Sequence, residues 1–170
     1  IRRGIMAGTI ELTVNGKALS LDVDTHLTLL DLLRHRLGLN GPKYGCGMAQ
    51  CGACTVLVDG APARACVLRA VKANGASVTT LEGLPNAETG EMHPVQQAFD
   101  EKQAAQCGYC INGMIMNTVA LLARNPSPTD DEIRQAHRHH LCRCGTHLEI
   151  LAAVRTAAEQ LAAKTEEHAQ

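Results

Sequence analysis

The sequence predicts an α+β protein in which a small strand-rich domain precedes a small helical one. In the first half, short runs alternate apolar and polar residues, as strands do. In the second half, the apolar residues recur at helical spacing. Between the halves, residues 82–91 collect Gly, Pro, Asn and Thr, a composition typical of a linker. We therefore expect two domains, at residues 9–81 and 92–163.

Local signals define the elements of the first domain. Two alternating runs joined by an Asn-Gly hairpin turn predict strands at residues 9–14 and 19–23. Leucines at helical spacing, followed by a glycine, predict a helix over residues 28–37. Two further runs complete a small mixed sheet, at residues 55–58 and 76–80.

The second domain is predicted to be helical throughout. Thr129 follows a proline and precedes Glu132 by three residues, which is the signature of a capping box at the start of a helix. The apolar periodicity predicts helices at residues 95–105, 111–124, 130–139 and 148–163.

Composition limits the classes of partner. With 170 residues and 45% apolar content the chain can build a core, but domains of about 80 residues often need metals, disulfides or a partner for stability. The formal charge is −1, and the only aromatic residues are two tyrosines and one phenylalanine. This balance gives no basis for nucleic-acid binding, by charge or by base stacking.

The sequence also bears on location. No apolar run approaches the roughly 18 residues of a membrane span. Arg2-Arg3 is not followed by the apolar region of an export signal. We expect a cytoplasmic protein without a direct membrane span, associated with a membrane only through a partner if at all.

The chain has eight cysteines, and without an export signal they indicate metal or redox chemistry rather than disulfides. The first set follows the C-x4-C-x2-C…C spacing of plant-type [2Fe–2S] proteins. Three nearby glycines let the backbone curl so that peptide N–H groups reach the sulfurs. A structural zinc site is the alternative, although zinc sites usually pair two CxxC-like knuckles. The set comprises Cys46, Cys51, Cys54 and Cys66.

The second set combines a CxxC with a distant CxC, and it is ambiguous when taken alone. A zinc knuckle and a dithiol redox pair both fit its spacing. Beside the first set a second [2Fe–2S] site is favoured, because eight thiols divide into four and four with none left over. Helix N-termini near both pairs would favour an anionic cluster. The set comprises Cys107, Cys110, Cys142 and Cys144.

Several other residues near the cysteines have expected roles outside the ligand sets. Arg143, between two candidate ligands, either raises the potential of a cluster or faces solvent or a partner. Met114 and Met116 are expected to pack in a core or an interface. The histidines around the CxC are expected mostly at the surface or at helix ends, with one near a partner's cofactor as the alternative; they are His137, His139, His140 and His147.

The sequence lacks the usual signs of bond-making chemistry. It has no GxGxxG or GxxxxGK[ST] loop for a nucleotide, its carboxylates are scattered, and every thiol is already assigned. We therefore expect a one-electron relay with no catalytic residues of its own.

Three motifs in order resemble the small iron–sulfur subunit of the molybdenum hydroxylases, the xanthine dehydrogenase/aldehyde oxidoreductase family. Residues 41–60 (GPKYGCGMAQCGACTVLVDG) resemble the first cluster loop of this family. Residues 106–114 (QCGYCINGM) and 141–145 (LCRCG) resemble the second cluster site. The resemblance runs from about residue 9 to residue 154.

The resemblance implies a β-grasp plant-type ferredoxin domain followed by a four-helix [2Fe–2S]-binding domain. It also implies a large partner subunit that holds molybdopterin, often as the cytosine dinucleotide in bacteria, and that hydroxylates its substrate with oxygen from water. In such enzymes the helical-domain cluster lies next to the pterin. Gln106 matches a residue that touches the pterin, and Cys144 matches the ligand nearest to it. Electrons would then pass outward to the first cluster.

Two departures from the family pattern affect the expected partners. The usual Gly-Asn before the CxC motif is His139-His140, and the usual aromatic residue after Cys-Gly-Thr is His147. The second-cluster motifs are most similar to small subunits of nicotinate-type hydroxylases, in some of which the acceptor is a cytochrome c subunit in place of an FAD subunit. We expect an N-heteroaromatic, nicotinate-like substrate. The alternatives are an aldehyde-oxidising enzyme and a free-standing ferredoxin-like carrier.

Overall fold

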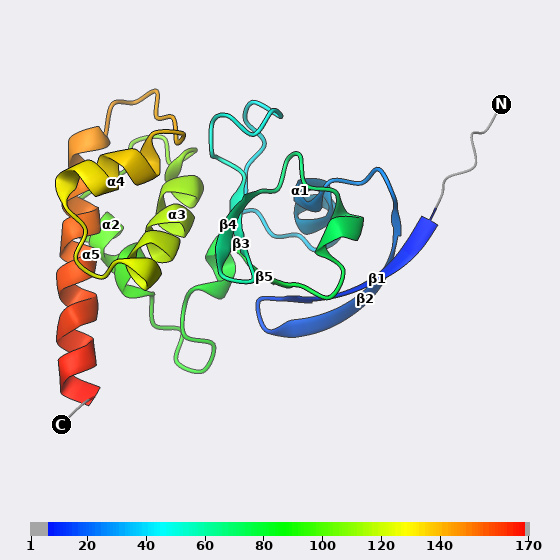
Figure 1. The fold of residues 1–170 in the computed structure, drawn as a ribbon, viewed down its shortest axis with the longest axis horizontal. Coiled ribbons are helices and arrows are strands. Elements are labelled where there is room, and N and C mark those ends of the chain that lie inside the picture. The colour runs from blue at the N-terminus through cyan, green and yellow to red at the C-terminus, as the bar shows by residue number, and fades with distance from the viewer. Residues whose placement is uncertain (1–6, 169–170) are drawn as a thin grey trace.

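The computed structural model describes residues 7–168, in which a sheet lies on one side and a group of helices on the other (Figure 1). This confirms the α+β class. Arg2 and Arg3, which entered the prediction of location, lie outside the described residues. Within residues 7–168, no helix combines the length and the apolar character that a membrane crossing requires.

The first domain is built on one five-stranded mixed sheet in the order β2-β1-β5-β3-β4. β1 runs antiparallel to β2 and parallel to β5, so the last strand of the domain pairs with the first. Both hairpins turn on a residue pair with left-handed backbone, Asn15-Gly16 and Asp59-Gly60, as type I′ turns require. The strands are β1 (Ala7–Val14), β2 (Lys17–Asp24), β3 (Thr55–Val58), β4 (Ala61–Arg64) and β5 (Ser77–Thr79).

Two features of this domain differ from the sequence prediction. β4 was missed because Ala-Pro-Ala-Arg carries no β-branched or aromatic residue, and its proline is tolerated since β4 lies at the edge of the sheet. The predicted helix is a single α-turn, α1 (Leu29–Asp31), that continues as a π-helix over Leu32–Arg36. Four leucines of this segment are buried in the core of the first domain; they are Leu29, Leu30, Leu32 and Leu33.

The second domain contains four longer helices. The predicted capping box is present at α4, where the Thr129 hydroxyl accepts from the Glu132 N–H and the Glu132 carboxylate accepts from the Thr129 N–H. α2 ends earlier than predicted, because Gln103 adopts a left-handed φ of 50°. The helices are α2 (Pro94–Glu101), α3 (Ile111–Arg124), α4 (Asp130–His137) and α5 (His147–His168).

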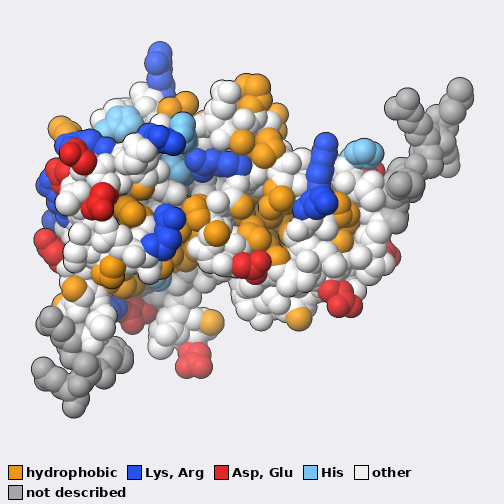
Figure 2. All heavy atoms as spheres, viewed as in Figure 1, with side chains coloured by type: hydrophobic (Ala, Val, Ile, Leu, Met, Phe, Trp, Pro, Cys, Tyr) orange, Lys and Arg blue, Asp and Glu red, His pale blue; other side chains and the backbone are white. Residues whose placement is uncertain are grey.

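α3 is the element that joins the two domains. It lies between the sheet and the outer helices and packs on β3 (Figure 1). Met116 and Ala120 of α3 form a small buried cluster with Leu57 of β3, which confirms the expected packing role of Met116. Met114 is buried in the core of the helical domain. Hydrophobic side chains are also visible over the middle of the molecule, where the two halves adjoin (Figure 2). The domain bounds at 9–81 and 92–163 stay a prediction.

Candidate metal centre

The first cysteine loop, residues 41–54, wraps its backbone around one sulfur. The Cys46 Sγ accepts N–H groups of Met48, Gln50 and Cys51 at 3.4, 3.2 and 3.3 Å. Burial acts to raise the pKa of Cys46, but these donors outweigh it and lower the value to about 7. Gly45 has no room for a side chain, because a Cβ there would lie 2.6 Å from the Cys51 Sγ. The loop is thus shaped to stabilise a thiolate.

The thiols of the first set come together as two pairs. The Cys46 N–H donates to the Cys51 Sγ at 3.4 Å, and the two thiols interact. Cys54, before β3, and Cys66, after β4, form a second hydrogen-bonded pair that is buried. Burial raises the pKa of Cys54 to about 12, so this thiol ionises at neutral pH only when a cation replaces its proton.

The second set forms two pairs as well, from segments more than 30 residues apart. Cys107 is hydrogen-bonded to Cys144, and Cys110, the N-cap of α3, is hydrogen-bonded to Cys142. Burial raises the pKa of Cys110 to about 12. Burial also acts to raise the pKa of Cys142, but hydrogen bonds from Thr146 outweigh it and the value falls to about 6. Each pair joins the start of α3 to the loop 138–146 that precedes α5.

This arrangement fits two-iron clusters. Each iron of a [2Fe–2S] cluster takes two thiolates and shares two sulfides, so the four protein ligands of the cluster are arranged as two pairs. The Cys46–Cys51 and Cys54–Cys66 pairs could hold one cluster, and the Cys107–Cys144 and Cys110–Cys142 pairs could hold the other.

The two thiol sets face a common cavity of about 210 Å³ between the domains. Cys46 and Cys51 line it from the first loop, and Cys107, Cys110 and Cys142 line it from the helical domain. The Cys107 end of the second set is exposed at the surface of the protein, whereas Cys54 and Cys66 are buried. The second set therefore reaches both the surface, through Cys107, and the cavity beside the first loop.

The two domains contact each other closely at the first cysteine loop, against which α3 packs. The buried Asn112 of α3 donates its amide to the carbonyl groups of Ala53 and Thr55, both at 2.9 Å. Next to it, a Cβ on Gly113 would lie 2.1 Å from the Gly52 carbonyl oxygen. Only a glycine at position 113 lets the helix approach the loop so closely.

His140 completes this contact, so the expectation that it lies at the surface or at a helix end is wrong. His139 and His147 are exposed as expected, but only 5% of the His140 surface is exposed. Its Nε2 lies 2.8 Å from Nη1 of Arg64 on β4. Burial, the Arg64 charge and the neighbouring histidines lower the pKa of His140 to about 3, so the ring is neutral. The sequence alone does not reveal the burial of His140, because its partner Arg64 lies 76 positions away along the chain.

The remaining predicted site residues lie at the surface near the second set. Gln106 is exposed and directly precedes the exposed Cys107. Arg143 is exposed and lines the cavity between the two sets, which leaves both of its predicted roles open. Cys144 is half-buried.

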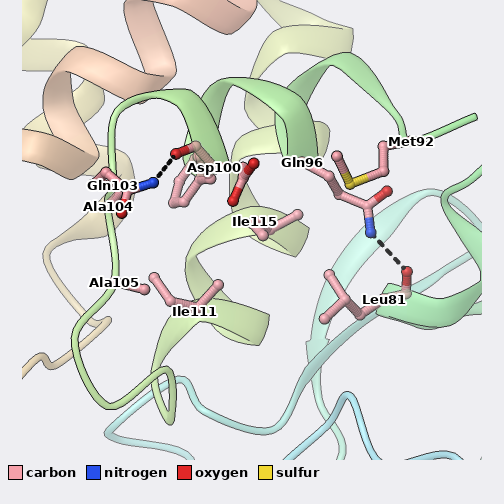
Figure 3. Close-up of a pocket in the computed structure, with 10 residues that line it drawn as sticks. Leu81, Met92, Gln96, Asp100, Gln103, Ala104, Ala105, Ile111 and Ile115 are labelled. Atoms are coloured by element: carbon pink, nitrogen blue, oxygen red, sulfur yellow. Dashed lines mark hydrogen bonds between the residues drawn. The ribbon is translucent and has the colours of Figure 1, made fainter.

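A second cavity is lined by residues 103–105, the segment that leads to Gln106. It has a volume of about 360 Å³ and lies between α2 and the start of α3 (Figure 3). Ile111 and Ile115 of α3 supply part of its apolar wall, and Gln96 fixes its far side by donating to the Leu81 carbonyl at 3.3 Å. It holds no thiol, so it is separate from the metal centre.

Comparison with protein families assigns a cluster to each domain. The family described as "2Fe-2S iron-sulfur cluster binding domain" matches residues 12–77, and the family described as "[2Fe-2S] binding domain" matches residues 80–155. Together with the paired thiols, these matches define a protein that carries two [2Fe–2S] clusters.

Known relatives identify the family more closely. One of the subunits of nicotinate dehydrogenase from Pseudomonas putida is 56% identical over 91% of this chain and 97% of its own length. The small FeS subunit of nicotinate dehydrogenase from Eubacterium barkeri is 47% identical over the same share of each chain. Among solved structures, a chain of quinoline 2-oxidoreductase from Pseudomonas putida 86 superposes with a TM-score of 0.85 at 40% identity, over 90% of this chain and 94% of that one. The chain belongs to the family of small iron–sulfur subunits of molybdenum hydroxylases.

Proposed function

We propose that this chain relays single electrons from a molybdopterin-bearing large subunit, through its second thiol set and then its first, to an acceptor subunit. As a member of its family it is part of a molybdenum-dependent oxidoreductase whose catalytic centre lies on another chain. When bound in that partner, molybdopterin supplies the conversion of a C–H bond and water to a hydroxyl group, two protons and two electrons. Two one-electron clusters can remove those electrons one at a time.

The order of the relay is supported by the exposure of the thiols. Cys107 and Gln106 present one edge of the second set to the surface, where a large subunit can dock. The same set also borders the cavity shared with the first loop, which Cys107, Cys110 and Cys142 line. In this proposal Gln106 and Cys144 lie nearest to the pterin of the partner.

The surface around the cysteines supports a large protein partner. Four hydrophobic side chains near the two loops are strongly exposed, between 48% and 63%: Tyr44, Met48, Tyr109 and Leu141. Exposed apolar side chains grouped beside a functional site are typical of a protein interface. An interface there would also shield the clusters from water.

We propose an N-heteroaromatic, nicotinate-like substrate for the whole enzyme. The observation that carries this is the 56% identity to the nicotinate dehydrogenase chain of Pseudomonas putida over nearly the full length of both chains. The iron–sulfur-binding subunit of aldehyde oxidoreductase from Escherichia coli is 44% identical and is matched over 72% of its length, which makes an aldehyde the second candidate. The proposed pterin is the cytosine dinucleotide form, and the proposed acceptor is a cytochrome c or an FAD subunit.

The native complex, isolated through a tag on this chain, tests the proposal. We expect molybdenum and about four irons per copy of this chain, the content of two [2Fe–2S] clusters. Under anaerobic conditions nicotinate should bleach the iron–sulfur absorbance, whereas a benzaldehyde control should not. Bleaching by the aldehyde alone would favour the second candidate. A monomer that purifies without molybdenum would instead indicate a free-standing electron carrier.

A further inference from the structure

One backbone hydrogen bond connects the two thiol sets. The Leu141 N–H donates to the Cys51 carbonyl at 3.0 Å. Leu141 directly precedes Cys142 of the second set, and Cys51 belongs to the first. The connection therefore runs from one candidate ligand to the other through a short stretch of backbone and a single hydrogen bond.

Leu141 itself does little to hold this bond in place. Its side chain is 62% exposed, and it lies in the loop 138–146, outside any helix or strand. The preceding residue is anchored instead: His140 is only 5% exposed and lies between Gly52 and Arg64 of the first domain and Gly113 of α3. A Cβ on Gly52 would lie 2.4 Å from the His140 Cδ2, so the ring is packed directly against the first loop.

Arg64 fixes both the position and the tautomer of His140. A guanidinium group can only donate, so the His140 Nε2, 2.8 Å from the Arg64 Nη1, must be the acceptor. The ring proton then lies on Nδ1. The other Arg64 nitrogen, Nη2, donates to the His139 carbonyl at 3.1 Å, so one side chain of β4 holds two successive residues of the loop. The Leu141 amide follows directly after these two anchored residues.

We propose that His140 is a positioning residue for electron transfer between the clusters: with Arg64 it holds the Leu141 amide against the Cys51 carbonyl and so sets the distance between the two thiol sets. The inference rests on the proposed relay function. His140 touches neither iron nor substrate in this assignment. It acts on the rate through the placement of the loop.

The test uses the complete complex with His140→Ala. Without the ring, Arg64 loses one of its acceptors and keeps only the His139 carbonyl as a contact to this loop, and the packing of the ring against Gly52 is lost. We expect both clusters to be retained, with unchanged iron content. In the dithionite-reduced complex, the spin–spin splitting between the two cluster signals should be lost, because magnetic coupling falls steeply with distance. After mixing with substrate, reduction of the first-set cluster should slow while reduction of the second-set cluster keeps its wild-type rate.

Two variants separate positioning from general damage. His139→Ala removes the exposed neighbouring side chain but keeps the backbone carbonyl that Arg64 binds, and it should behave as wild type. His140→Asn keeps a side-chain acceptor for Arg64 and should restore the splitting and much of the rate. Equal effects of His139→Ala and His140→Ala would overturn the proposal.

The remaining outcomes for His140→Ala are equally decisive. Wild-type splitting and rates in this variant would show that the contact does not set the distance. Loss of iron from it would assign His140 to holding a cluster rather than to spacing, and would also overturn the proposal. The splitting after dithionite reduction does not depend on turnover. Failure of the relay function would therefore be seen separately, because substrate would then not reduce the clusters of the wild-type complex.

Discussion

Asn112 connects the two domains through a single amide group. Both of its partners, the carbonyl groups of Ala53 and Thr55, are acceptors, so a side-chain donor with two N–H bonds is needed at this position. The residue is only 2% exposed, and water cannot take over these contacts. The chemistry of the residue, and not only its size, is therefore required.

The change Asn112→Asp keeps the shape of the side chain and removes both donors. A buried carboxylate facing two carbonyl oxygens should lower the free energy of unfolding by about 3 kcal/mol at neutral pH. Denaturant unfolding of the cluster-loaded chain, followed by iron–sulfur absorbance, measures this loss. Asn74→Asp is the matched control, because Asn74 is exposed and only accepts, from the Glu11 N–H at 2.7 Å. A similar loss in both variants would contradict this role for Asn112.

At Gly113, a substitution that normally stabilises a helix should instead destabilise the protein. In a helix interior, replacing Gly with Ala usually gains about 1 kcal/mol. At Gly113→Ala the new methyl group would lie 2.1 Å from the Gly52 carbonyl oxygen, so α3 must move away from the first loop. We expect lower stability and a weakened signal splitting between the reduced clusters. Gly8→Ala, where nothing lies within 4 Å, is the control; a stabilised Gly113→Ala chain would refute the close approach.

At the scale of elements, the short segment after β5 holds the start of the first cysteine loop. The Glu82 carboxylate accepts from the Gly41 N–H at 2.6 Å and from the Thr80 hydroxyl at 2.7 Å. Burial acts to raise the pKa of Glu82, but these hydrogen bonds outweigh it and lower the pKa below its ordinary value. The segment predicted to be a linker therefore has a structural function at its first residue.

This contact predicts a pH-dependent effect of Glu82→Gln. Because the folded pKa is lowered, the carboxylate stabilises the fold above its unfolded pKa of about 4.3, and this contribution is lost as the pH falls through the folded pKa. At pH 7 we expect a loss of about 1 kcal/mol, kept small by solvent exposure. Thermal unfolding from pH 7 down to pH 3 should show the difference from wild type shrinking with acidity. A difference that is constant with pH would contradict the role of the charge.

The elements with strong local signals were predictable from sequence. The hairpin β1–β2 follows from alternation and Asn15-Gly16, and α3 and α4 follow from their periodicity and cap. β4 was not predicted, because its own residues, Ala61–Arg64, carry no strand-forming side chain, although the Asp59-Gly60 turn before it is a hairpin signal. The end of α2 depends on the left-handed backbone of Gln103, which no local pattern of this sequence indicates.

At the scale of the whole molecule, the sequence indicated which cysteines group together but not how the groups meet. Ligand spacing reflects the chemistry of the cluster and is visible along the chain. The contact between the domains depends on residues far apart in sequence, such as Arg64 with His140 and Asn112 with Ala53. Each of these residues has an ordinary local context, so only the fold reveals its partner.

The most direct test of the relay is the reduction of each cluster by substrate in complexes that lack the other. Cys110→Ala removes a thiol of the second set, and Cys51→Ala removes one of the first. In the Cys110→Ala complex, nicotinate should leave the first-set cluster oxidised, although dithionite reduces it and so shows that it is present. In the Cys51→Ala complex, nicotinate should still reduce the second-set cluster. Electron paramagnetic resonance of rapidly frozen samples distinguishes the two signals, and normal reduction of the first-set cluster by nicotinate in Cys110→Ala would contradict the relay.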